Sequence, residues 1–303
     1  MKKRIAAIDI GTNTILMLLA ESEGSGVFRI LGDYHDIARL GESLGKTGKI
    51  CDDAIERASN ILQKYMNICR ELDIDIIRTV GTAALREAKN GVYVRNVFEN
   101  IIGFPVEIIP GEAEAAMSYL GAADNVGQAS VLDIGGGSSE LIAGAVGKIL
   151  SRISLPIGAV KLTEKLLSAS PPLESEISDG RKFIRNILIE KIKFPVKGEL
   201  IAVAGTPTTI AYVLLGLNGY DEKAVQGYQL KLSELDELLT EFAKLKASEI
   251  SEKYHIHPLR ADVITMGGLI LSEIMKFLGR NCCTVSSHGL RYGIMKDFIN
   301  NKL

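Results

Sequence analysis

The sequence has little excess charge of either sign and no long apolar run. Its formal net charge is −2 over 303 residues, so nothing draws the whole chain to nucleic acid or to an anionic membrane. The longest apolar run, Ile15 to Ala20, is far short of the roughly 20 residues of a membrane helix. The basic start, Met1 to Arg4, leads into no unbroken apolar segment and no small-x-small cleavage site. We therefore expect neither a signal peptide nor a membrane anchor.

Cysteine pairs and several familiar motifs are also missing. The four cysteines form no CxxC pair and no metal-ligand spacing, which predicts reduced cysteines in a cytoplasmic protein. Neither GxxxxGK[ST] nor GxGxxG occurs, which argues against a P-loop or a Rossmann nucleotide-binding site. No GxSxG elbow surrounds a serine, which argues against a serine nucleophile of the hydrolase type.

A run of three glycines is the feature around which the chain is organised. Gly135, Gly136 and Gly137 stand between an apolar strand that ends near Asp133 and a second strand that begins near Glu140, with Ser138 and Ser139 in between. Glycine loses the most backbone entropy on ordering, so such a run indicates a need for bare backbone. Successive free N–H groups can hold phosphate, with the serine hydroxyls as further donors.

The two acids beside this loop would repel a phosphate by themselves. A hard cation such as Mg²⁺, or Mn²⁺ in its place, resolves the conflict by bridging carboxylate and phosphate oxygens. Asp133 and Glu140 are therefore candidate metal ligands. For a single loop, a glycine-rich hairpin whose acids face water is the competing interpretation.

Two further loops of this kind favour phosphate binding over a glycine-rich hairpin whose acids face water. At the N-terminus, Asp9 precedes Gly11 and Thr12, and the next two residues, Asn13 and Thr14, stand where the second loop has Gly137 and Ser138. A third loop, Gly205-Thr206, follows an apolar strand that ends at Ala204. Three glycine-hydroxyl turns after strands favour a phosphate chain held by several loops, with Asp9 as a further metal ligand.

The order of predicted elements repeats along the chain. Residues 5–31 and residues 129–155 each give three short apolar strands, and helices and a further strand follow in both halves. This predicts an internal duplication, with one domain over residues 1–124, a second over 125–303 and a cleft between them. Asp52 or Asp53 is expected to cap the first long helix. A closing helix from residue 288 can pack back on the first domain.

Two charged residues outside the loops are candidates for catalysis. Glu114 follows a proline and a glycine at the start of a helix, where it either complements the helix dipole or acts as a general base on water. Arg86 is either a solvated ion-pair partner or a fork for phosphate oxygens. A basic run from Arg181 to Lys197 is either a solvated helix face or a guide for an anionic polymer.

The sequence resembles the exopolyphosphatase and guanosine pentaphosphate phosphohydrolase family, Ppx/GppA, of the actin, sugar kinase and Hsp70-like superfamily. Seven segments in the order of that family carry the resemblance, and together they span nearly the whole chain: AAIDIGTNT, TVGTAALREA, IPGEAEAAMSYLG, VLDIGGGSSEL, AVAGTPTTIA, RADVITMGG and GLRYG.

The resemblance implies an α/β protein of two ribonuclease H-like, actin-like domains with the site between them. It matches Glu114 to the catalytic glutamate, Arg86 to an arginine position, and Asp133 and Glu140 to acids that position Mg²⁺. The phosphate loops are matched by Gly11 to Thr14, Gly135 to Ser138, and Gly205 with Thr206. Tyr292 departs from the pattern, because that position is often acidic.

The expected activity is Mg²⁺-dependent hydrolysis of terminal phosphate from inorganic polyphosphate. Guanosine pentaphosphate is the alternative substrate, because the loops grip phosphate and do not reveal an attached guanosine. An ATP-driven module, a sugar kinase and a nucleotide sensor remain further alternatives. No nucleic-acid or membrane partner is expected, and the family makes a homodimer plausible. Long members carry an additional C-terminal region, and its absence predicts a preference for short chains or weaker processivity.

Overall fold

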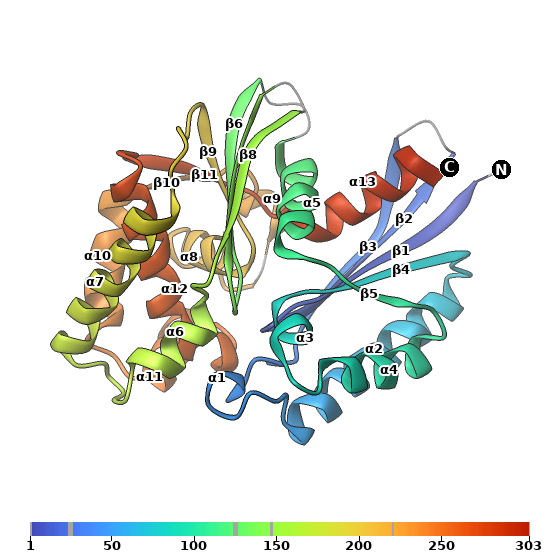
Figure 1. Ribbon diagram of the computed structural model, residues 1–303, viewed down its shortest axis with the longest axis horizontal. Coiled ribbons are helices and arrows are strands. Elements are labelled where there is room, and N and C mark those ends of the chain that lie inside the picture. The colour runs from blue at the N-terminus through green and yellow to red at the C-terminus, as the bar shows by residue number, and fades with distance from the viewer. Residues whose placement is uncertain (1, 24–26, 124–126, 146–147, 220, 303) are drawn as a thin grey trace. The chain divides into compact units, whose positions relative to one another are not determined.

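The structure, a computed structural model, describes residues 2–23, 27–123, 127–145, 148–219 and 221–302. The chain divides into two compact units (Figure 1). Unit 1 comprises Met1–Gly121 and His288–Leu303, and unit 2 comprises Ala122–Ser287. The sequence division placed residues 288–303 at the end of the second domain and left their packing on the first domain open. The structure assigns this segment to unit 1.

Unit 1 is built on a five-stranded sheet in the order β3-β2-β1-β4-β5. Its strands are β1 (Lys3–Ile10), β2 (Thr14–Ser22), β3 (Phe28–Ile37), β4 (Ile76–Gly81) and β5 (Val106–Ile108). The first three strands form the antiparallel meander that the sequence predicts. Strands β4 and β5 run parallel to β1. The carboxyl ends of β1, β4 and β5 therefore lie at one edge of the sheet.

The helices of unit 1 are α1 (Leu44–Thr47), α2 (Asp52–Glu71), α3 (Ala83–Glu87), α4 (Gly91–Ile102), α5 (Gly111–Ala123) and α13 (Leu290–Lys302). The prediction that Asp52 or Asp53 caps α2 is wrong, because Cys51 is the N-cap residue. Both aspartates lie in the first helical turn, where carboxylates complement the positive end of the helix dipole.

The two faces of the unit 1 sheet are covered by different helices. Ala6, Ile8 and Ile10 of β1 pack in a core with residues of α2 and α4. Ile5 and Ala7, which alternate with them, pack in a second core with residues of α13. Asp9 has the same parity as Ile5 and Ala7, so its side chain belongs to the face that α13 covers.

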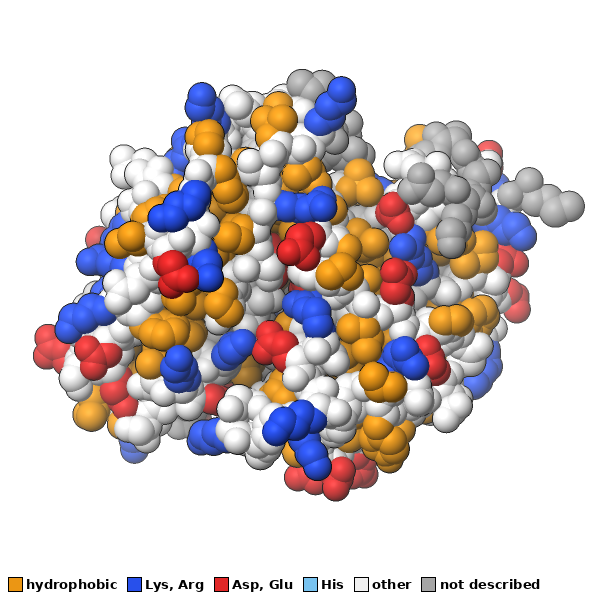
Figure 2. All heavy atoms as spheres, in the orientation of Figure 1, with side chains coloured by type: hydrophobic (Ala, Val, Ile, Leu, Met, Phe, Trp, Pro, Cys, Tyr) orange, Lys and Arg blue, Asp and Glu red, His pale blue; other side chains and the backbone are white. Residues whose placement is uncertain are grey.

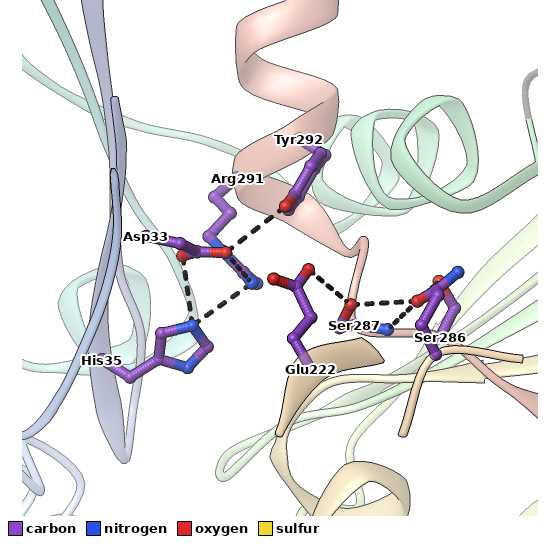
Figure 3. Close-up of polar contacts among 8 residues, drawn as sticks. Asp33, His35, Glu222, Ser286, Ser287, Arg291 and Tyr292 are labelled. Atoms are coloured by element: carbon purple, nitrogen blue, oxygen red, sulfur yellow. Dashed lines mark hydrogen bonds and ion pairs between the residues drawn. The ribbon is translucent and has the colours of Figure 1, made fainter. Parts of the chain in front are cut away.

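An ion pair attaches α13 to the edge strand β3. Arg291 Nε and Nη2 donate hydrogen bonds of 2.8 and 2.7 Å to the two carboxylate oxygens of Asp33 (Figure 3). Tyr292 donates from its hydroxyl to Asp33 Oδ2 at 3.4 Å, and its ring is buried in the α13 core. Tyr292 thus takes a structural part in unit 1.

Unit 2 repeats the strand topology of unit 1. Its sheet has the order β10-β11-β9-β6-β7-β8, with strands β6 (Gln128–Ile134), β7 (Ser139–Ala145), β8 (Lys148–Leu155), β9 (Glu199–Val203), β10 (Gln229–Lys231) and β11 (Cys282–Val285). Strands β8, β7, β6, β9 and β11 stand in the same order and directions as β3, β2, β1, β4 and β5. The edge strand β10 is an addition that the sequence did not predict. The expected duplication is therefore present in the sheet topology.

The helices of unit 2 are α6 (Ala159–Leu166), α7 (Glu174–Lys191), α8 (Gly205–Leu214), α9 (Glu222–Val225), α10 (Leu232–Phe242), α11 (Ala247–Tyr254) and α12 (Pro258–Phe277). Most of α12 is buried, including every residue from Met266 to Met275. The short helices α9 and α11 were not predicted. None of the helices in the described ranges is both long and apolar enough to cross a bilayer.

The basic run on α7 is largely engaged in ion pairs. Arg181 Nη1 donates to Oε1 of the fully buried Glu273 at 2.7 Å, and Arg185 contacts the other oxygen of that carboxylate. Lys182 pairs with Asp179 on its own helix. On the face shown in Figure 2, basic and acidic side chains are interspersed. These contacts favour a structural role for the arginines over guidance of a polymer.

Candidate active site

The first glycine loop is a tight hairpin between β1 and β2. Gly11 N–H donates to the carbonyl of Thr14 at 3.0 Å and closes the turn. A Cβ at position 11 would lie 2.9 Å from that carbonyl oxygen, so a side chain would open the turn. Asp9, at the end of β1, is 8% exposed.

Residues 38–41 hold the carbonyl groups of this loop. Asn13 O accepts from the N–H groups of Ala38 and Arg39 at 3.0 and 2.8 Å, and Thr12 O accepts from Gly41 N at 2.8 Å. In a trans peptide the N–H points opposite to the C=O. The N–H groups of Asn13 and Thr14 are therefore directed away from residues 38–41.

The second loop has the same closing hydrogen bond. Gly135 N–H donates to Ser138 O at 3.0 Å, as Gly11 does to Thr14. Gly135 O and Gly136 O accept from the N–H groups of Ala159 and Lys161 at 2.9 and 3.0 Å. By the same peptide geometry, the N–H groups of Gly136 and Gly137 are directed away from α6. This is the orientation that an anion-binding nest requires.

A row of polar residues crosses the sheet beside the second loop. In the register of unit 2, Asp133 of β6 lies opposite Glu140 of β7, and Glu140 lies opposite Ser154 of β8. Directly opposite residues have Cβ atoms about 4.5–5.5 Å apart. Asp133 is 7% exposed and Glu140 is 1% exposed. Two carboxylates are thus neighbours in a buried place.

The third loop lies next to the second at the same sheet edge. Strand β9 pairs in parallel with β6, with Val203 opposite Asp133. Ala204, which follows Val203, has a φ of 76°, a strained value for a residue with a side chain. Gly205 and Thr206 then begin α8, so their N–H groups belong to the unsatisfied first turn of a helix.

Arg260 is a residue that the sequence analysis missed. It lies in the first turn of α12, and a Cβ at Gly205 would collide with its Nη1 atom. The guanidinium group therefore lies directly against the third loop. Its segment, RADVITMGG, carries part of the family resemblance, and this was the available signal.

Unit 1 places its two candidate catalytic residues in contact. Arg86 Nη1 lies 3.1 Å from Glu114 Oε2 and donates to Ile109 O at 2.8 Å. Arg86 is on α3 after β4, and Glu114 is in the first turn of α5 after β5. The first loop follows β1, which lies beside β4. All three features therefore stand at the carboxyl edge of the parallel strands.

The structure corrects one expected phosphate donor. Ser139 Oγ donates to Ile157 O at 2.7 Å, and the side chain is fully buried. Ser139 thus fixes the strand to the segment before α6. Ser138 remains a candidate at the loop itself, where it is 4% exposed.

Two units whose sheets share the strand order 3-2-1-4-5, each with a glycine hairpin after its first strand, define a protein of the actin-like α/β fold. The chain belongs to the Ppx/GppA phosphatase family, which matches residues 19–302. Members of this family are phosphoanhydride hydrolases, and the chain is an enzyme of that type.

Two curated relatives are similar over nearly the whole chain. Exopolyphosphatase 2 of Mycobacterium tuberculosis is 30% identical over 313 aligned positions, which cover 96% of this chain and 97% of that protein. The bifunctional 3-dehydroquinate synthase/phosphatase of Fusobacterium nucleatum is 31% identical over 98% of this chain, and the match takes up 47% of that protein.

Solved structures agree with the family. The crystal structure of the Aquifex aeolicus Ppx/GppA family member has a TM-score of 0.82 and 30% identity, and covers 99% of this chain and 98% of its own. An exopolyphosphatase-like protein has a TM-score of 0.93 and 29% identity, with 98% of each chain covered.

Proposed function

We propose that this enzyme is an exopolyphosphatase that releases orthophosphate from the end of inorganic polyphosphate with the help of Mg²⁺. The observation that carries the proposal is the buried pair Asp133 and Glu140 beside a loop whose N–H groups are turned to one side. In a member of a phosphatase family, the two carboxylates would hold a metal ion that neutralises phosphate charge. The loop N–H groups would bind the phosphate oxygens.

The two carboxylates of unit 2 fit a magnesium ion. Mg²⁺ prefers oxygen ligands and is often held by one or two carboxylates together with substrate phosphates. No cluster of three or more potential metal ligands occurs among the described residues, so Asp133 and Glu140 would depend on phosphate and water for the rest of the shell. In unit 1, Asp9 holds the corresponding position and is a third candidate. Bound Mg²⁺ or Mn²⁺ would neutralise phosphate charge.

The loops supply the phosphate contacts in this proposal. The N–H groups of Gly136 and Gly137 and the hydroxyl of Ser138 would bind phosphate oxygens. Gly205 and Thr206 would add the first-turn N–H groups of α8. The hairpin Gly11 to Thr14 of unit 1 would contribute in the same manner.

Glu114 would act as the general base. It would take a proton from water, whose oxygen attacks the terminal phosphorus while the bond from that phosphorus to the bridging oxygen breaks. The remaining chain leaves with the bridging oxygen, and orthophosphate is released. Arg86 would hold the Glu114 carboxylate in one orientation and present its remaining N–H groups to phosphate.

Guanosine pentaphosphate is the second candidate substrate. The family is named for both activities, and each loop described above addresses phosphate groups only. The full-length match to an exopolyphosphatase of M. tuberculosis favours polyphosphate as the first choice.

One assay tests the proposal. Phosphate release is measured side by side from polyphosphate, guanosine pentaphosphate and ATP, with Mg²⁺ and with excess chelator, and Glu114→Gln serves as the inactive control. We expect the highest kcat/KM with polyphosphate, and no activity without divalent ions. A higher kcat/KM with guanosine pentaphosphate would transfer the assignment to that substrate, and release from ATP alone would contradict both.

A further inference from the structure

Ser154 makes a short hydrogen bond to one of the proposed metal ligands. Its Oγ donates to Glu140 Oε1 at 2.6 Å, a length typical of a hydroxyl bonded to an ionised carboxylate. The serine lies on β8, the last strand of the unit 2 sheet, directly opposite Glu140. Nothing in the sequence motifs pointed to this residue.

We propose that Ser154 positions the Glu140 carboxylate for the divalent cation, an inference that rests on the proposed role of Glu140 as a metal ligand. Ser154 is a positioning residue in this proposal, because its hydrogen bond is to Glu140, the proposed metal ligand. Hydrogen-bonded partners of metal-binding carboxylates fix their orientation and contribute to metal affinity.

The sheet register explains why such a partner is needed. Asp133 lies on one side of Glu140 and Ser154 on the other. Like charges directly opposite each other across a sheet are unfavourable. Repulsion from Asp133 alone leaves several rotamers open to the flexible Glu140 side chain. A donor on the side away from Asp133 selects one of them. The entropy of ordering the side chain is then lost on folding and not on metal binding.

The segment that carries Ser154 is itself held against the second loop. Three residues further along, Ile157 O accepts the hydrogen bond from Ser139 at 2.7 Å. Next, a Cβ at Gly158 would lie 2.5 Å from the carbonyl carbons of Gly136 and Gly137. Both contacts fix β8 and its continuation relative to the loop. The hydroxyl of Ser154 is therefore placed by the same segment that shapes the phosphate nest.

The sharpest test compares two side chains of nearly equal shape. Ser154→Thr keeps the hydroxyl, whereas Ser154→Val replaces it with a methyl group, and both β-branched residues suit a strand. Ser154→Ala removes the hydroxyl with the least change in volume. Ser151→Ala is the matched control, because Ser151 lies on the same strand, is half-buried, and faces the opposite side of the sheet.

The primary measurement is Mn²⁺ binding to the whole protein without substrate, followed by electron paramagnetic resonance. We expect Ser154→Val and Ser154→Ala to raise the dissociation constant about tenfold, as for other partners of metal ligands. Ser154→Thr and Ser151→Ala should stay near wild type. In phosphate-release assays, the Mg²⁺ concentration for half-maximal rate should rise in parallel, while kcat at saturating Mg²⁺ changes little.

Glu140→Gln, measured in the same way, separates the two proposals. If it weakens Mn²⁺ binding while Ser154→Val does not, the role of Ser154 is wrong and the metal role of Glu140 stands. If Glu140→Gln leaves Mn²⁺ binding unchanged, the metal role of Glu140 fails, and the inference about Ser154 fails with it. Equal Mn²⁺ affinities of Ser154→Thr and Ser154→Val would also overturn the inference, because the hydroxyl would then have no part in binding.

Discussion

Arg86 and Glu114, which come from different helices of unit 1, form an ion pair of 3.1 Å at the carboxyl edge of the sheet. The Glu114 side chain is 10% exposed and that of Arg86 is 26% exposed. An ion pair that is partly withdrawn from water fixes the carboxylate more firmly than a surface pair does. In the proposed mechanism, Arg86 therefore positions the Glu114 carboxylate in addition to any contact with phosphate.

The first prediction concerns Glu114. Glu114→Gln should lower kcat by about 10² to 10⁴-fold, because the amide cannot accept the proton of water. It can still accept a hydrogen bond from Arg86, so the local structure and substrate binding should persist. The measurement is kcat together with equilibrium binding of polyphosphate to the variant.

Glu112→Gln is the control, because Glu112 lies in the first turn of the same helix and is exposed. Its stability should change by no more than about 0.5 kcal/mol, as for surface substitutions in general, and its kcat should stay near that of the wild type. Equal loss of binding and turnover in Glu114→Gln would instead assign Glu114 a structural part.

The second prediction is that Asp133 and Glu140, the proposed metal ligands, lower the stability of the folded protein when no metal is bound. Glu140→Gln removes one of two like charges that lie directly opposite each other across the sheet, an unfavourable arrangement, and should therefore stabilise the metal-free protein. The same change should abolish activity at moderate Mg²⁺ concentrations. The measurement is the midpoint of thermal unfolding with excess chelator and with Mg²⁺.

The informative measurement is the direction in which Mg²⁺ shifts the midpoint of thermal unfolding. Mg²⁺ should raise the unfolding midpoint of the wild type, because it binds the folded state only. The rise should be much smaller in Glu140→Gln and in Asp133→Asn. A wild-type midpoint that does not respond to Mg²⁺ or Mn²⁺ would contradict the site.

The third prediction concerns the packing behind the second loop. Gly158→Ala would bring a methyl group within 2.5 Å of the carbonyl carbons of Gly136 and Gly137. Backbone cannot yield as a side chain can, so the loop must shift. Since a displacement of about 1 Å in a catalytic site can cost 10²-fold in rate, we expect a loss of that order in kcat/KM.

Gly45→Ala is the matched control for this substitution. A Cβ at Gly45 meets no atom within 4 Å, so its kcat/KM should be that of the wild type. If Gly158→Ala retained full activity with an unchanged unfolding midpoint, the loop would not need the shape that α6 gives it.

The fourth prediction is a pH dependence of stability in unit 1. Burial alone would raise the pKa of Asp33, but hydrogen bonds from His35 and Arg291 outweigh it and lower the pKa from 3.8 to about 2. The ionised form is therefore favoured in the folded state. At neutral pH the ionised Asp33 carboxylate stabilises the folded state by about 2.5 kcal/mol. This stabilisation is present above about pH 4 and is lost as the pH falls towards 2.

Asp33→Asn should accordingly destabilise unit 1 at pH 7 and have little effect near pH 2. Hydrogen exchange of the α13 amides as a function of pH follows this directly, because Arg291 holds α13 to β3. Asp36→Asn, which removes the partner of the exposed Lys64, should change stability by less than about 1 kcal/mol at any pH. If the loss of stability in Asp33→Asn did not vary with pH, the substitution would act through packing and not through the charge of Asp33.

The strands, the duplication and the glycine loops could be predicted because each is a local pattern. Alternation of apolar residues gives strands, and three glycines in a row are unfavourable unless bare backbone is required. The position of Asp133 two residues before Gly135, and of Asp9 two residues before Gly11, follows from the printed sequence alone. The small net charge also argued against a general attraction to nucleic acid or to anionic membranes.

Contacts between distant segments were decided only by the tertiary structure. The partners Ser154 and Glu140 meet because β8 pairs with β7, and Arg260 reaches Gly205 because α12 packs on α8. The ion pair of Asp33 with Arg291 joins residues 258 positions apart. Such pairs leave no periodic signal, because only the pairing of strands and the packing of helices bring their side chains within hydrogen-bonding distance.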